Sequence, residues 1–122
     1  MNYIDNRPKT IFCDIDGTLV KHSSPSEYSK KNYKMEVLDG VIEKLIDFDR
    51  KGYNVVLTTG RKESMRKVTE QQLSDAGIFY DQLIMGIGGG IRVLINDKKP
   101  NGNKTSISFN LERNEGISNL NI

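Results

Sequence analysis

The sequence lacks several features that point to particular classes of protein. Its single cysteine, Cys13, excludes an internal disulfide framework and a cluster of thiolate metal ligands. No apolar run approaches the roughly 20 residues that cross a membrane, and residues 1–10 lack the basic and then apolar order of a signal peptide. We therefore expect a soluble, cytoplasmic protein without a membrane partner.

An excess of charge of one sign is also missing. The 122 residues include 18 basic and 16 acidic side chains, and the formal net charge of +2 is spread along the chain. Such a balance does not create the strong field that attracts nucleic acid or membrane surfaces, so any attraction for phosphate has to be local. The length fits a single domain over residues 1–122, with no room for a second core.

The order of apolar patterns predicts an α/β fold with an open, mostly parallel sheet. Residues 19–36 are rich in Ser, Lys and Tyr without either regular period, so we expect a surface flap there. In an open parallel sheet, ligands gather outside the carboxyl ends of the strands. Strands are expected at residues 10–15, 53–57, 82–85, 92–95 and 106–111, and helices at about 40–51 and 62–76.

Two acids follow the first expected strand. Asp14 and Asp16 are two residues apart and share a face, and Gly17 lets the chain turn away directly after them. Two neighbouring carboxylates repel each other, and Mg²⁺ relieves that repulsion. With phosphate nearby, one carboxylate can attack phosphorus while the other donates a proton to the leaving oxygen. A capped turn is the plain alternative for this short pattern, and an EF-hand fits less well because Gly17 is fourth instead of sixth.

Residues 14–19, Asp-Ile-Asp-Gly-Thr-Leu, resemble the first motif of the haloacid dehalogenase superfamily of phosphatases and phosphotransferases. With later motifs, the resemblance covers roughly residues 10–100. It implies that Asp14 is the nucleophile and a metal ligand, and that Asp16 is the general acid and base with its carbonyl facing Mg²⁺. It also implies a three-layer, Rossmann-like core of the capless type, because the length excludes a large cap.

Residues 55–61 resemble the second motif of the same superfamily, in which a hydroxyl at a strand end holds a phosphoryl oxygen. This assigns the role to Thr59, while Thr58 is expected to face the other way. Backbone N–H groups at the start of the following helix favour anions, so Gly60 and Arg61, together with Gly17, complete the expected phosphate-binding set. Hydrogen bonding at a strand end is the alternative for both threonines.

Residues 93–97 resemble the fourth motif, in which an acid after an apolar strand completes the Mg²⁺ site, so Asp97 is the expected third ligand. The lysine of the third motif has no counterpart in residues 85–90. Arg92 is the nearest cation in the sequence and the expected catalytic substitute. Without a cation, repulsion between the acids and phosphate slows the transfer. Further choices are Lys62, Lys98 and Lys99.

These motifs predict a Mg²⁺-dependent phosphatase that forms an aspartyl phosphate. An open site favours bulky substrates or a lid from a second copy of the chain in a homo-oligomer. By similarity to small capless members, a phosphorylated sugar or related metabolite is the leading substrate, and a terminal phosphate on nucleic acid is the second. The alternatives are a Mg²⁺- and phosphate-binding module with little turnover, which the missing lysine favours, and a receiver-type phosphorylation domain, which residues 14–19 disfavour.

The flap carries three further candidates. His22, the only histidine, is positioned to touch substrate, although a solvated loop residue is the stronger interpretation. Tyr28 and Tyr33 lie among lysines and could stack on a nucleotide, and here too a solvated flap is the stronger interpretation. The lysines are Lys21, Lys30, Lys31 and Lys34.

Overall fold

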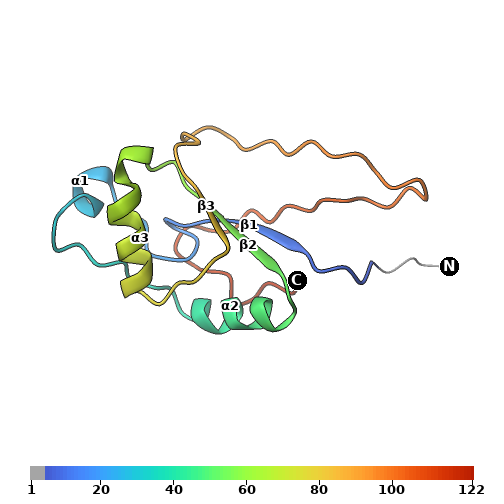
Figure 1. Cartoon of the computed structure of the whole chain (residues 1–122), viewed down its shortest axis with the longest axis horizontal. Coiled ribbons are helices and arrows are strands. Elements are labelled where there is room, and N and C mark those ends of the chain that lie inside the picture. The colour runs from blue at the N-terminus through green and yellow to red at the C-terminus, as the bar shows by residue number, and fades with distance from the viewer. Residues whose placement is uncertain (1–4) are drawn as a thin grey trace.

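The sheet in the computed structural model, which describes residues 5–122, has three parallel strands in the order β1-β2-β3 (Figure 1). In the parallel register, Asp14 pairs with Thr58 and Thr58 pairs with Ile84. The carboxyl ends of all three strands therefore meet at one edge of the sheet, as the sequence predicts. The strands are β1 (Thr10–Asp14), β2 (Asn54–Thr58) and β3 (Gln82–Ile84).

The helices end close to where the apolar spacing places their ends. Gly52 and Gly77 follow α2 and α3, as expected for C-terminal stops. The second expected helix begins with a 3-10 turn, so its regular part is shorter than predicted. None of the helices in residues 5–122 has the length and apolar content to cross a membrane. The helical elements are α1 (Pro25–Tyr28), α2 (Val41–Arg50), η1 (Glu63–Met65) and α3 (Arg66–Asp75).

One face of the sheet carries the hydrophobic core. Both connections run in the same direction along the sheet, so right-handed crossovers bring α2 and α3 to the same face. On the opposite face, Phe12 is 59% exposed and Ile84 is 40% exposed. The described residues thus build the sheet and one helical layer of the three-layer arrangement expected from the sequence. Core side chains include Cys13, Val55 and Leu57 of the strands, Val41, Leu45 and Phe48 of α2, and Leu73 of α3.

Two expected strands, at residues 92–95 and 106–111, do not form in the described part of the chain. Residues 87–111 instead make an extended arm, orange in Figure 1, in which Ile91 is 95% exposed and Ile95 is 88% exposed. A strand parallel to β1 needs a crossover of about a dozen residues or more, and residues 85–91 are too few for one. The outer edge of β1 therefore stays without a neighbouring strand in residues 5–122.

The C-terminal segment, residues 112–122, returns from the arm to the core. Ile117 is only 3% exposed and belongs to the core cluster. The backbone N–H of Asn114 donates to the carbonyl oxygen of Gly17 at 2.8 Å, and its side-chain oxygen accepts the backbone N–H of His22 at 2.7 Å. A segment with little sequence pattern therefore clasps the loop that follows β1.

Candidate active site

Asp14 ends β1 at the carboxyl edge of the sheet, beside Thr58 of β2. Its side chain is 45% exposed, so one end of the carboxylate faces solvent. The Thr18 hydroxyl lies 3.4 Å from one carboxylate oxygen. Desolvation raises the pKa of Asp14 above its ordinary value, and the charge of Arg92 opposes that rise. Asp14 is thus an accessible acid in partly apolar surroundings.

The cation nearest to Asp14 in this structure is the one that the sequence singles out. A guanidinium nitrogen of Arg92 lies 3.9 Å from a carboxylate oxygen of Asp14. Arg92 is the sixth residue of the arm, which leaves the core next to the site through the glycine-rich residues 86–90. Because both side chains are about half exposed, this pair adds charge to the site but little to stability.

Asp16 is held by a buried ion pair. The Arg61 guanidinium donates to both carboxylate oxygens of Asp16, from Nε at 3.0 Å and from Nη2 at 2.9 Å. The Arg61 side chain is 1% exposed and that of Asp16 is 14% exposed. A bidentate pair of this kind fixes the orientation of the carboxylate as well as its position.

Gly17 shapes the turn that directly follows the two acids. Its φ of +86° lies in the left-handed region that favours glycine, and its N–H donates to the carbonyl of Val20 at 2.7 Å. That N–H is therefore engaged within the protein, and the expected contact of Gly17 with phosphate does not use it. A Cβ at Gly17 would lie 3.2 Å from Cγ of Arg113, a cation that sequence analysis did not single out.

Arg61 does not point its charge at solvent, contrary to the expected direct contact with phosphate. Besides Asp16, its Nη1 donates to Gln72 at 2.6 Å and to Thr69 at 3.3 Å. All three guanidinium nitrogens of Arg61 donate to partners within the protein, because Asp16 lies beside them and Thr69 and Gln72 project from the buried face of α3. Sequence analysis missed both partners, although polar residues three apart on the face that also carries Leu73 were a signal that a buried charge lies opposite.

Thr59 and Gly60 form the loop between β2 and η1. Thr59 is 2% exposed, and its hydroxyl oxygen accepts the backbone N–H of Arg61 at 3.1 Å, which leaves the hydroxyl proton for another acceptor. The loop is backed by the glycine-rich residues 86–90, since the N–H of Gly86 donates to the carbonyl of Arg61 at 2.8 Å. The glycines that stand where the lysine was sought therefore support the loop that begins with Thr59 and Gly60.

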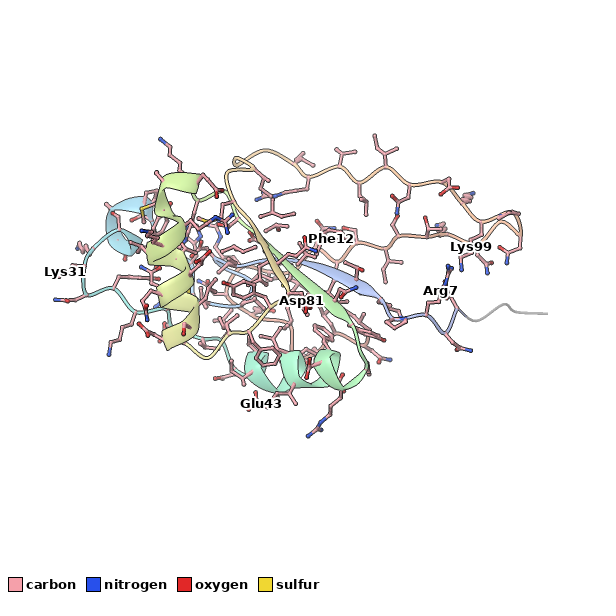
Figure 2. The ribbon with its side chains drawn as sticks, in the orientation of Figure 1. Arg7, Phe12, Lys31, Glu43, Asp81 and Lys99 are labelled. Carbon is pink, nitrogen blue, oxygen red and sulfur yellow. The ribbon has the colours of Figure 1, made fainter. Side chains whose placement is uncertain are left out.

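Asp97 is not brought to Asp14. Two residues further along the arm, Lys99 forms an ion pair with Asp5, which precedes β1. The step from Thr10 to Asp14 alone spans about 13 Å of strand, so Asp97 lies at the opposite end of β1 from the site. Figure 2 shows Lys99 near Arg7, far from α3. Among residues 5–122, no three acidic, histidine or cysteine side chains gather closely enough to hold a metal ion.

The remaining candidates lie in the core or in the flap. Cys13 is a buried free thiol on the core face, as expected, and desolvation raises its pKa to about 12. His22 is exposed, and its backbone is held by Asn114. The Tyr28 ring lies over the Arg61 guanidinium, with its centroid 4.0 Å from Cζ, so one face of the ring is already covered.

Comparisons with known proteins find a matching family and several similar structures, and each covers about two thirds of the chain or more. Residues 8–91 match the family model described as the polynucleotide kinase PNKP phosphatase domain. No curated protein sequence matches the chain at a significant level.

Three solved structures share the fold. One, of a Pnkp1/Rnl/Hen1 complex, is 31% identical with a TM-score of 0.56 and covers 70% of this chain. Another, of the Pnkp1/Rnl/Hen1 RNA repair complex, is 32% identical with a TM-score of 0.55 and covers 69%. The matched parts make up only 30% and 28% of those two chains. A third, from Vibrio cholerae, is 20% identical with a TM-score of 0.51, covers 73% of this chain and 79% of its own, and indicates the fold alone.

Proposed function

Because the chain belongs to the polynucleotide kinase PNKP phosphatase domain family, within the haloacid dehalogenase superfamily, we propose that it hydrolyses a terminal phosphate monoester on a nucleic acid strand. The observation that carries the proposal is the meeting of Asp14, Asp16 and the loop at residues 59–61 at the carboxyl edge of the sheet. Phosphatase chemistry of this type needs two acids and an anion-binding loop in one place.

The substrate class follows from the similarities and from the open site. The family description refers to polynucleotides, and one of the similar structures is named as an RNA repair complex. Both favour a nucleic acid end, which the sequence alone places second, and neither supports the phosphorylated sugar that it places first. With no cap in residues 5–122 to enclose a small metabolite, a long strand can reach Asp14.

The proposed mechanism uses the two acids in turn. The Asp14 carboxylate attacks phosphorus and forms an aspartyl phosphate, while Asp16 gives a proton to the departing oxygen of the strand. A water molecule then attacks the phosphorus of the aspartyl phosphate, its proton passes to Asp16, and phosphate leaves with Asp14 restored. Arg92 stabilises the charge that develops near Asp14.

Arg61 and Thr59 support these steps from behind. Arg61 fixes the orientation of the Asp16 carboxylate, and the two carboxylate oxygens each keep a lone pair for a proton. Thr59 offers its hydroxyl proton to a phosphoryl oxygen, and we assign the expected contact of Gly60 to its backbone. The proposed phosphate-binding set is therefore Thr59 and Gly60, with Arg61 acting through Asp16.

The donors at the site fit Mg²⁺ in chemistry. Mg²⁺ is bound in proteins by one or two carboxylates, with phosphate and waters as the other ligands. The half-exposed carboxylate of Asp14 and the backbone carbonyl of Asp16 are such donors, whereas the position of Asp97 does not make it one. When bound, the cation would neutralise the repulsion between Asp14 and a phosphate dianion.

The test is turnover by the purified protein with Mg²⁺ on oligonucleotides that carry a 3′- or 5′-phosphate, on sugar phosphates and on an aryl phosphate. We expect release of phosphate from an oligonucleotide end, and its loss in Asp14→Asn with the fold intact by circular dichroism. Turnover on sugar phosphates alone would overturn the proposed substrate. Mg²⁺ binding without turnover on any substrate would favour the binding module instead.

A further inference from the structure

Tyr28 connects the flap to the ion pair that holds Asp16. The residue ends α1, and its ring lies over the guanidinium of Arg61, 4.0 Å from Cζ. Stacking of a guanidinium on an aromatic face is favourable, and more so when the guanidinium is buried as it is here. The ring therefore covers one face of the Arg61 guanidinium, whose edges donate to Asp16, Thr69 and Gln72.

A second contact fixes Tyr28 to the same cluster. The side-chain amide of Gln72 donates to the carbonyl of Tyr28 at 2.9 Å, while its oxygen accepts Nη1 of Arg61 at 2.6 Å. Gln72 is only 6% exposed, so both ends of its amide are committed. The backbone and the ring of Tyr28 are thus both tied to Arg61, one through Gln72 and one directly.

The flap around Tyr28 has its own local structure. Pro25 starts α1, and the Glu27 carboxylate accepts the backbone N–H of Ser24 at 3.0 Å. No side chain of α1 is buried, so the short helix has little packing of its own to hold it in place. The stack on Arg61 and the hydrogen bond from Gln72 place Tyr28 beside the site.

From this arrangement we propose that Tyr28 is a positioning residue, whose ring holds Arg61 so that the Asp16 carboxylate keeps its orientation toward the reacting phosphate. The inference rests on the proposed function of Asp16 as the acid and base. Tyr28 itself does not touch substrate. The flap, read from sequence as solvated, is then a working part of the site.

One test of the proposal does not depend on activity. The Arg61 Nε–H, which donates to Asp16, is followed by nitrogen-15 NMR and assigned by its loss in Arg61→Lys. We expect slow hydrogen exchange of this group in the wild type and in Tyr28→Phe, which keeps the ring, and exchange at least tenfold faster in Tyr28→Ala. Unchanged exchange in Tyr28→Ala would overturn the proposal, whether or not the protein is a phosphatase.

A kinetic test separates positioning from a general structural role. An alkoxide leaving group needs the proton from Asp16, whereas p-nitrophenolate leaves with little help. Asp16 also serves the hydrolysis of the aspartyl phosphate, which both substrates share, so the comparison uses kcat/KM, which reports the formation of that intermediate. We expect Tyr28→Ala to lower kcat/KM about tenfold or more on a phosphorylated oligonucleotide end and less than about threefold on p-nitrophenyl phosphate. Tyr28→Phe should behave as the wild type.

The outcomes of the two tests are distinct. Equal losses of kcat/KM on both substrates, or the same loss in Tyr28→Phe as in Tyr28→Ala, would mean that Tyr28 only supports the fold. A wild type without any turnover would remove the proposed function, and the exchange of the Arg61 Nε–H would still decide whether Tyr28 holds Arg61.

Discussion

Gly60 packs against the backbone of Gly88. A Cβ placed on Gly60 would lie 3.0 Å from the carbonyl oxygen of Gly88, closer than real Cβ atoms usually approach. The loop that carries Thr59 is therefore in direct contact with the glycine-rich residues 86–90. Any side chain at position 60 has to push one loop away from the other.

The first prediction follows from this contact. We expect Gly60→Ala to destabilise the protein by about 1–3 kcal/mol through overpacking, and to lower turnover because the loop with Thr59 moves. Gly89→Ala is the matched control, since a Cβ there meets nothing within 4 Å. Urea unfolding measures both variants, and equal stability of the two would contradict the packing argument.

The second prediction concerns how the folding stability of the metal-free protein depends on pH through Asp14. Because desolvation raises the pKa of Asp14, folding penalises its charged form. The contribution of neutral Asp14 to folding stability is fully present below the pKa that Asp14 has in the unfolded chain. It is lost as pH rises through the higher pKa of Asp14 in the folded protein. We therefore expect Asp14→Asn to be more stable than wild type at pH 7.5 in EDTA, with a smaller difference at pH 4.5.

Urea unfolding at the two pH values measures this difference. Glu36→Gln is a control, because the Glu36 side chain is 70% exposed. A constant difference for Asp14→Asn at both pH values would show that its origin is not the charge.

The third prediction separates activity from stability at Arg92. Its pair with Asp14 is half exposed, so Arg92→Ala should leave the midpoint of unfolding nearly unchanged. If Arg92 takes the place of the absent lysine, its loss should lower kcat on the order of a hundredfold, as for other electrostatic stabilisers. Lys98→Ala tests a cation further along the arm, and equal kinetics of the two variants would exclude a special role of Arg92.

The fourth prediction concerns the buried ion pair. Arg61→Met leaves the Asp16 carboxylate and the Gln72 oxygen without their donor, so we expect a loss of about 3 kcal/mol of stability. Arg61→Lys should recover only part of it, because a lysine cannot donate to both carboxylate oxygens in a fork. The control is Lys21→Met, which removes a pair 3.8 Å long between two exposed side chains. Similar stability of Arg61→Met and Lys21→Met would contradict the prediction.

The fifth prediction uses the distance between Asp97 and the site. With the arm placed as in this structure, Asp97→Ala should leave the affinity for Mg²⁺ unchanged in calorimetry, while Asp14→Ala should remove binding. A loss of affinity in Asp97→Ala would mean that the arm folds back along the free edge of β1 when the metal binds.

Much of the core follows from local pattern. The strands β1, β2 and β3 and the helices α2 and α3 have clear periods and glycine stops, so their order and approximate ends could be predicted. Asp14 and Asp16 were identifiable because their spacing and the following glycine depend on one short segment. Arg92, chosen because it is the nearest cation to the third-motif segment, lies beside Asp14, and its catalytic role stays a prediction.

Other features depend on contacts between distant segments. Residues 92–95 have the composition of a strand, yet pairing with β1 needs a crossover that the short connection does not provide. The direction of Arg61 depends on Thr69 and Gln72, whose spacing indicates a buried charge opposite α3 but not which residue carries it. The packing of residues 112–122 has no periodic signal because single contacts, such as those of Asn114, hold it.

The hydrogen bonds of Asn114 to Gly17 and His22 make the C-terminal segment part of the folded unit. The family match ends at residue 91, but Ile117 packs in the core and Asn114 holds the loop that follows the two acids. A fragment that ends at residue 91 would keep both proposed catalytic acids, Asp14 and Asp16. It would lose Asn114 and Ile117, which fix the loop after these acids and fill the core. A chain cut at residue 91 should consequently fold poorly and lack activity.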